Sequence, residues 1–247
     1  GVVVPWSYPA FGDTIPPWAD GVNYTIKSRA VDRSQNVEPL EPSFSFTYDQ
    51  TAPTTTVSVP AIGGYVQTVS TITGPFSEGF GLARVQVAIQ RQDDKFWDGT
   101  GFNVTANPTP VPWYDAQIWE STWSYFDADF AAAYALQPGI VQYVIWVAGT
   151  DAAGNINRST QTFWLAAGGG DSDFYIDPFR PVSIATSPPT QFHTGAVTPI
   201  VGTAIDRDAN GNPAGAGMMT GAAMALKVMR VDSTGAIGFN NGLGGWV

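Results

Sequence analysis

The 247-residue sequence has no cysteine, a single histidine (His193) and only 11 Lys and Arg residues. Without cysteine there is no disulfide and no thiolate zinc site, and one histidine leaves too few ligands for most zinc enzymes. The few basic residues form no run that could neutralise a phosphate backbone or attract anionic lipid, which disfavours nucleic acid and membrane surfaces as partners. No apolar run approaches the roughly 20 residues of a membrane span, and Gly1–Pro5 lacks the pattern of a signal peptide.

Motifs for catalysis are missing as well. Neither G-x-S-x-G nor H-E-x-x-H occurs. The neighbouring carboxylates Asp93 and Asp94, or Asp127 and Asp129, have the spacing of loop charges, and nothing in the sequence places two of them across a cleft. We therefore expect that the chain is not an enzyme.

Charged residues make up 13% of the chain, against about 25% in ordinary soluble domains. The 27 Gly and 19 Pro residues indicate many turns and few helices, while the 44% of hydrophobic residues is enough for a packed core. The low charge suggests that a neighbour covers part of the surface. The net charge of −10 fits an exported protein or a binder of divalent cations, and also fits simple solubility.

The most informative feature is an internal repeat. Residues 22–53 match 141–181, with Tyr24 and Tyr143 separated by 119 positions and Asp49 and Asp177 by 128. Nine extra residues account for the change of offset, and we assign them to a Gly-rich loop at Ala166–Ser172. The matching positions in this first block are Tyr24 and Tyr143, Asp32 and Asp151, Asn36 and Asn155, Asp49 and Asp177, and Pro53 and Pro181.

Residues further along repeat at the same interval of 128, with Pro60 matching Pro188 and Gly74 matching Gly202. The segment 81–91 matches 221–230 after an insertion. The repeat predicts three parts: residues 1–53 as the C-terminal half of one unit, 54–181 as a complete unit, and 182–247 as the N-terminal half of the next. An excision from a long array, averaging of near-identical repeats, and half-repeats that complete each other between subunits all remain open.

Alternating apolar residues predict strands, as in Val85–Ile89, and an apolar segment at Tyr143–Gly149 predicts a strand covered on both faces. Aromatic strands are expected at 44–46 and 163–165, and a short helix at 127–136 before Pro138. Short strands separated by Gly, Pro and Asn turns indicate a two-sheet sandwich.

The pattern Tyr-x-Ile, then Ala-x-Asp-x-x-x-Asn, then an aromatic strand and Pro resembles bacterial Ig-like and fibronectin-type tandem repeats of large secreted adhesins and giant surface proteins. Asp151-Ala-Ala-Gly154-Asn155 matches the frequent D-x-A-G-N turn of these repeats, whereas Asp32–Asn36 lacks the Gly. The resemblance implies an all-β fold of tandem Ig-like β-sandwich repeats, each spanning the interval of 128 found above and containing at most one short helix. It also implies an extracellular, cell-surface location.

Three kinds of binding or modification site are candidates. Alternate oxygens in a D-x-D-x-N-G loop suit calcium, an Asn-Gly turn being the equal alternative, and the junction carboxylates Asp49 and Asp177 are weaker candidates. The calcium loop consists of Asp206, Asp208, Asn210 and Asn212. The aromatic candidates, which could fill a core, an inter-repeat contact or a sugar platform, are Trp6, Trp97, Trp113 and Trp246. The N-x-S/T sequons are Asn23, Asn103 and Asn157.

The sequence therefore predicts a structural or adhesive repeat protein that forms a rod or filament on a microbial surface, with neighbouring copies or repeats as its partners. Head-to-tail completion of half-repeats is one way to build such a filament. The alternative is a carbohydrate-binding accessory module of a secreted enzyme, which would require exposed, coplanar Trp rings and surface glycans as partners.

Overall fold

The computed structural model describes residues 3–8, 14–105, 111–135, 139–158, 171–187, 199–206, 226, 228–231 and 237–239. His193, Trp246 and three of the four calcium-loop candidates, Asp208, Asn210 and Asn212, lie outside these residues. The chain forms two compact units, one of residues 1–136 and 141–176 (unit 1) and one of residues 137–140 and 177–247 (unit 2).

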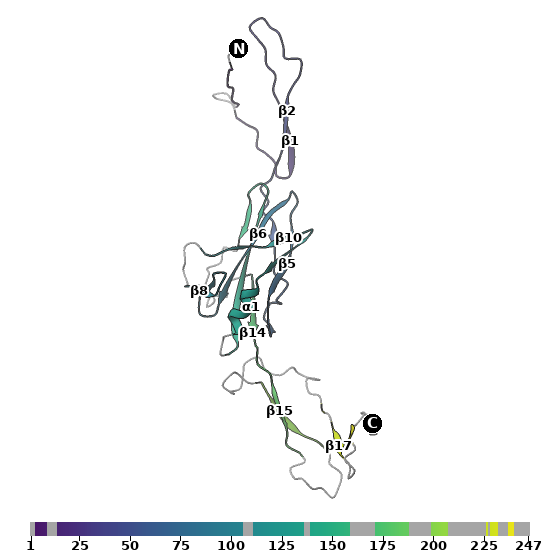
Figure 1. Ribbon diagram of the computed structural model, residues 1–247. Coiled ribbons are helices and arrows are strands. Elements are labelled where there is room, and N and C mark those ends of the chain that lie inside the picture. The colour runs from purple at the N-terminus through teal and green to yellow at the C-terminus, as the bar shows by residue number, and fades with distance from the viewer. Residues whose placement is uncertain are drawn as a thin grey trace. The chain divides into compact units, whose positions relative to one another are not determined.

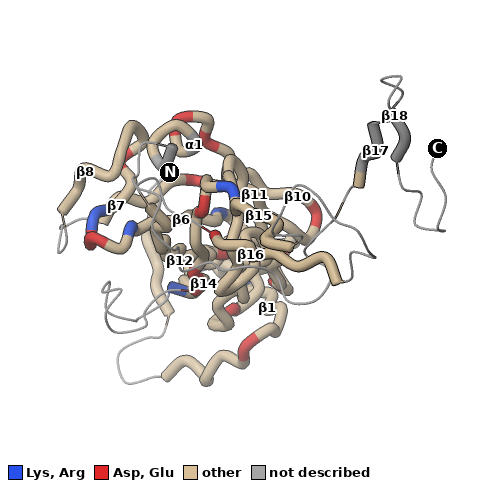
Figure 2. The backbone as a smooth tube through the Cα atoms, turned by 90° about the horizontal axis from the view of Figure 1, so that it is seen from below, with Lys and Arg blue, Asp and Glu red and all other residues tan. Residues whose placement is uncertain are grey.

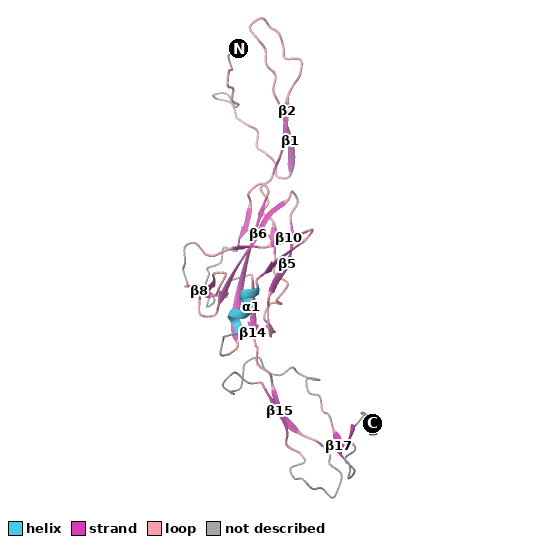
Figure 3. Cartoon of the chain, viewed as in Figure 1, coloured by secondary structure: helices cyan, strands magenta, loops and turns pink. Residues whose placement is uncertain are grey.

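The fold is all-β, with 47% of residues in strands and 3% in one short helix, as the sequence predicts (Figures 1 and 3). The elements of unit 1 are β1 (Val22–Lys27), β2 (Ser43–Tyr48), β3 (Thr54–Thr55), β4 (Gly64–Val66), β5 (Thr71–Ser77), β6 (Leu82–Arg91), β7 (Phe96–Trp97), β8 (Phe102–Val104), β9 (Tyr114–Asp115), β10 (Gln117–Trp119), β11 (Thr122–Phe126), α1 (Ala128–Ala135), β12 (Val141–Asp151), β13 (Ile156–Arg158) and β14 (Ser172–Ile176). Unit 2 contains β15 (Val182–Ala185), β16 (Gly202–Ile205), β17 (Met229–Val231) and β18 (Ile237–Phe239).

Most of unit 1 is a sandwich of two sheets. One sheet has the strand order β10-β11-β5-β3, and the other has the order β4-β14-β12-β6-β7-β8, with β13 beside β12 and β9 beside β6. Alternate side chains of each strand point inward, so the two sheets share one apolar core. The core joins Ile72 and Trp123 of the first sheet to Ile89, Tyr143 and Phe174 of the second.

Strand β12 is buried along nearly its whole length, which confirms the prediction from its unbroken apolar sequence. One face, with Tyr143 and Ile145, belongs to the main core. The other face, with Val144 and Trp146, packs against Ala88 in a second cluster. β12 therefore has no face left for solvent, as expected for a central strand covered on both sides.

The predicted helix at 127–136 is confirmed as α1, and Asp127 caps its N-terminus. One carboxylate oxygen of Asp127 accepts hydrogen bonds from backbone N–H groups of the first turn at 2.9 and 3.3 Å. The other accepts the ring N–H of Trp97 at 3.0 Å and the hydroxyl of Tyr125 at 2.8 Å. A single side chain thus anchors the helix to both sheets.

The hairpin β1–β2 has the same register as the pair β12–β14 of the sandwich. Tyr24 faces Phe46 in the first pair, and Tyr143 faces Phe174 in the second. The rings stack in both pairs, with centroids 5.7 and 5.5 Å apart. Tyr24 and Tyr143 are 119 positions apart in the sequence, and Phe46 and Phe174 are 128 positions apart.

This register corrects the placement of the insertion. The sequence predicts an aromatic strand at 163–165, which lies outside the described residues, and a loop reaching Ser172. The loop prediction is wrong at its end, because Ser172 opens β14, which pairs with β12. The extra residues therefore precede β14.

In unit 2, the strand pair β15–β16 repeats the pair β3–β5 at a sequence offset of 128. Thr54 faces Ser77 in one pair, and Val182 faces Ile205 in the other. The hydrogen bonds beyond the strands also recur, since the N–H groups of Ser58 and Thr186 donate to the carbonyls of Thr73 and Val201, both at 2.8 Å.

Gly74 and Gly202 occupy the same place in these two pairs. A Cβ at Gly74 would lie 1.7 Å from the carbonyl oxygen of Thr56, and a Cβ at Gly202 would lie 2.3 Å from that of Ile184. Any larger residue would push the two strands apart, so the spacing of the pair explains both glycines.

Candidate junction site

Two Asp-x-x-x-Asn turns have the same hydrogen bonds. In the first, the carboxylate of Asp32 accepts the backbone N–H of Asn36 at 2.9 Å and its side-chain amide at 2.8 Å. In the second, Asp151 accepts the same two groups of Asn155 at 2.8 and 2.9 Å. In each turn the Asp N–H also donates to the Asn carbonyl, at 3.0 and 3.1 Å. These turns close the ends of equivalent strands, as Asx geometry allows.

Each turn contains one residue with positive φ directly before the Asn. Gly154 has φ +94° and Gln35 has φ +67°. Glycine adopts this conformation at little cost, whereas Gln35 adopts it against a penalty of about 1 kcal/mol. The first turn therefore keeps the geometry although it lacks the glycine.

The second turn lies beside the segment that leads into the sandwich. The side-chain amide of Asn155 donates to the carbonyl oxygen of Asp49 at 3.1 Å. Carboxylate oxygens of Asp49, Glu78 and Asp151 all lie within 4.8 Å of one another. Three positions far apart in the sequence thus meet where β2, β5 and β12 end, and we call them the junction cluster.

Several hydrogen bonds hold the segment after β2 at this point. Asp49 accepts the N–H of Thr51 at 3.0 Å. Asp20 accepts the N–H of Gln50 at 2.6 Å and the hydroxyl of Thr51. These bonds, that of Thr51 first, lower the pKa of Asp20 below its ordinary value. The backbone that follows Asp49 is therefore hydrogen-bonded both to Asp49 itself and to Asp20.

The junction cluster concentrates negative charge in a partly buried place. Asp151 is only 2% exposed, and one oxygen of Asp49 is buried and accepts no hydrogen bond. Burial raises the pKa of Asp151, but the hydrogen bonds from Asn155, together with those from the backbone of Gly154 and Ala153, outweigh that effect and leave the pKa below its ordinary value. Two unit charges 4.8 Å apart repel by about 1 kcal/mol in water and by about 3.5 kcal/mol at an effective dielectric constant near 20.

A second carboxylate pair occurs in unit 2 at the equivalent positions. Asp177 follows β14 as Asp49 follows β2, and Asp206 follows β16 as Glu78 follows β5, with the same interval of 128 in both cases. The N–H of Phe179 donates to Asp177 at 3.0 Å, which repeats the bond from Thr51 to Asp49.

The two carboxylates of this second pair interact. Burial raises the pKa of Asp177 above its ordinary value, the N–H of Phe179 opposes the rise, and the charge of Asp206 and a hydrogen bond with it add to the rise. Asp206 is 7% exposed. The sequence singled out Asp206 as the first residue of a calcium loop. In the structure it interacts with Asp177, and the rest of that loop lies outside the described residues.

The three aromatic candidates that the structure describes differ in exposure. Trp97 is fully buried in the core of the sandwich, so it fills a core rather than a contact surface. Trp113 packs beside the second cluster, and the guanidinium of Arg158 lies 4.6 Å from its ring centroid. Trp6 is 71% exposed.

The three sequons differ in their surroundings. Asn23 and Asn103 are exposed, and their side-chain amides donate to Thr47 at 3.3 Å and to Asp98 at 2.9 Å. Asn157 lies in β13, paired with β12, and is partly buried. The first two are therefore the more accessible to a modifying enzyme.

Comparison of the sequence with protein-family models and with curated proteins gives no match. Within the described residues, no helix has the length and apolar character needed to cross a membrane. Figure 2 marks Lys and Arg of the described backbone in blue and Asp and Glu in red; the sequence has 11 of the former and 21 of the latter.

Proposed function

We propose that the chain is a structural segment of an extracellular repeat protein that forms a rod or filament on a microbial surface, and that calcium binds at its junctions. Repeats of this kind contact their neighbours along one direction, so the stiffness of each junction sets the stiffness of the rod. The proposed role is mechanical spacing, with adhesion as the purpose of a rod at a cell surface.

One observation carries the proposal: the carboxylates that follow β2 and β5 recur, at the interval of 128, after β14 and β16. A charge pair that occurs at the entry to the sandwich and again at the equivalent place in unit 2 costs stability through repulsion unless it has a partner. A role in joining successive repeats accounts for its recurrence at that place.

Calcium suits the oxygens of the junction cluster. This ion takes six to eight oxygen ligands at about 2.4 Å, so two oxygens on one ion lie at most about 4.8 Å apart. The carboxylates of Asp49, Glu78 and Asp151 meet this limit. The buried oxygen of Asp49 that accepts no hydrogen bond is available to an ion.

An ion at this place would join three separate segments of the chain. Asp49 precedes the linker at residues 50–53, Glu78 follows β5, and Asp151 ends β12. The linker is already tied to the sandwich through Asn155, and an ion would add bonds to both sheets. Calcium sites of extracellular modules have Kd of about 10⁻⁴ to 10⁻³ M, so we expect a Kd in that range for an extracellular segment.

Small-angle scattering of the 247-residue chain in calcium and in chelator tests the proposal. We expect calcium to narrow the distribution of molecular dimensions because the linker is fixed. Glu78→Gln should remove this response. Glu120→Gln, which makes the same charge change at an exposed position after β10, should keep it. Identical scattering in calcium and chelator would contradict the proposal.

The carbohydrate-binding alternative finds less support among the described residues. Four Trp residues lie at positions 97–123. Trp97 and Trp123 are fully buried, so neither ring face is open to a sugar. One side of Trp113 is occupied by Arg158. Trp119 is 61% exposed, so of the four Trp residues at positions 97–123 a single ring is well exposed, whereas a sugar platform needs several.

A further inference from the structure

The hairpin β1–β2 exposes side chains whose equivalents in the sandwich are buried. Ile26 is 46% exposed, while Ile145, its equivalent in β12, is fully buried. Phe44, which faces Ile26 across the hairpin, is 67% exposed. Part of the same face is already covered, because the ring of Trp18 lies edge-on against Tyr24 at 4.7 Å. The open part of this face, at Ile26 and Phe44, is apolar, like the inward face of one sheet of a sandwich.

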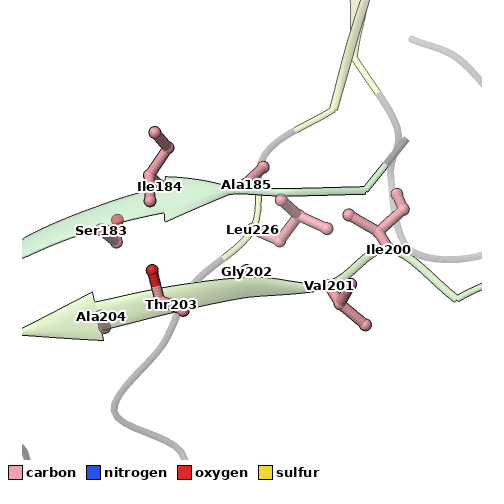
Figure 4. Close-up of a pocket in the computed structure, with 9 residues that line it drawn as sticks. All are labelled: Ser183, Ile184, Ala185, Ile200, Val201, Gly202, Thr203, Ala204 and Leu226. Carbon is pink, nitrogen blue, oxygen red and sulfur yellow. The ribbon is translucent and has the colours of Figure 1, made fainter. Parts of the chain in front are cut away.

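The strand pair β15–β16 exposes the opposite half. Ile200 is 42% exposed, while Ile72, its equivalent before Gly74, is 1% exposed. Leu226 is 66% exposed, and together with Ile200 and Ala185 it lines one hollow beside the two strands (Figure 4).

The complete sandwich shows how these two halves fit. There, Val57, which follows β3, and Ile72 of β5 lie in the same core as Ile145 and Phe174 of the other sheet. By the recurring registers, the first two correspond to Ala185 and Ile200 of β15–β16, and the last two correspond to Ile26 and Phe46 of β1–β2. The chain thus contains both halves of a second sandwich core, and each half exposes what the other would cover.

We propose that the β15–β16 face of one copy of this chain seats on the β1–β2 face of a second copy and completes a sandwich between them. The occupant is a second copy because the complementary face is present in the chain itself. The contact joins two different surfaces, so it propagates head to tail into an open filament. This inference rests on the proposed repeat architecture and adds the partner and the surface through which it binds.

Charge substitutions on each face test the proposal by complementation. Ile26→Glu leaves a copy with only its β15–β16 face, and Ile200→Glu leaves a copy with only its β1–β2 face. Sedimentation velocity of the full chain, over a wide concentration range and in chelator, should show growing assemblies for the unaltered chain and monomers for each variant. An equal mixture of the two variants should give a dimer and nothing larger, because only one productive contact remains.

Matched controls use exposed positions of the same two strand pairs that do not line the hollow. Thr25→Glu and Val182→Glu place the same charge beside Ile26 in β1 and at the start of β15, and neither residue lines the hollow. Both should assemble like the unaltered chain. Circular dichroism should show the middle sandwich unchanged in all four variants.

Three results would overturn the proposal. The first is an unaltered chain that stays monomeric at every concentration, which includes the case in which the chain covers its own faces. The second is assembly that survives both single variants. The third is a mixture that stays monomeric. Glu78→Gln separates this proposal from that of the calcium junction. The variant should lose calcium binding, but it should still assemble in chelator like the unaltered chain.

Discussion

Replacing Glu78 by Gln should change stability in opposite directions with and without calcium. The variant removes one negative charge from the junction cluster and retains an oxygen that can accept the N–H of Phe80, now bonded at 2.8 Å. In chelator, the loss of repulsion with Asp49 and Asp151 should stabilise the sandwich. Glu78 is partly exposed, so about 1 kcal/mol per pair, or about 2 kcal/mol in total, is the appropriate scale.

Calcium should reverse the order. An ion that binds only the folded state at 100 times its Kd stabilises the unaltered chain by about 2.7 kcal/mol, and the variant should lose most of that gain. Urea unfolding monitored by the fluorescence of the buried Trp97, Trp123 and Trp146 measures both conditions. Glu120→Gln should shift neither curve. If Glu78→Gln destabilises the chain in chelator, or if calcium leaves the unaltered chain unchanged, the reasoning about the cluster is wrong.

Three further predictions concern the sandwich. Asp127→Ala should cost about 3 kcal/mol, because it removes a helix cap worth about 1 kcal/mol and leaves the buried ring N–H of Trp97 without that acceptor, at about 2 kcal/mol; urea unfolding measures the loss. Gly74→Ala should cost about 3 kcal/mol or more, because its Cβ would meet the carbonyl of Thr56; the midpoint of thermal unfolding should fall. Hydrogen bonds to Asp98, first among them the one from the side chain of Asn103, lower its pKa from 3.8 to about 2. The Asp98 carboxylate should therefore stabilise the fold fully above pH 3.8 and lose that contribution as the pH falls toward 2. Asp98→Asn should make the free energy of unfolding depend less on pH over this range.

Neighbouring positions provide the controls for these changes. Asp129→Ala alters a first-turn carboxylate of α1 that does not cap the helix, and it should cost under about 0.5 kcal/mol. Gly79→Ala adds a methyl group with nothing within 4 Å of it and should be nearly neutral. If either control equals its partner, the mechanism assigned to that partner is wrong.

The sequence was sufficient to predict the fold class, because the period-2 alternation of strands such as β6 and the unbroken apolar run of β12 follow directly from which faces are buried. The helix followed from an apolar, Ala-rich segment ended by Pro and Gly. The repeat does not predict the position of strand β14, because the chain between β13 and β14 contains extra residues. The periodicity of a sequence does not locate an insertion. Only the pairing of Tyr143 with Phe174 places β14.

The junction cluster could be predicted only in part. The sequence places Asp49 at a repeat boundary and Asp151 in a turn. Their meeting with Glu78 depends on which strand ends share one end of the sandwich, which requires the sheet order. The interval of 128 between Glu78 and Asp206 is a signal in the sequence, and it is weak because the two residues differ in type.

Calorimetric titration of the full chain with calcium tests the central claim most directly. The account predicts saturable binding that is lost in Glu78→Gln and kept in Glu120→Gln. Binding of equal strength in both variants, or no binding to the unaltered chain, would contradict the assignment of Asp49, Glu78 and Asp151 as the junction that stiffens the rod.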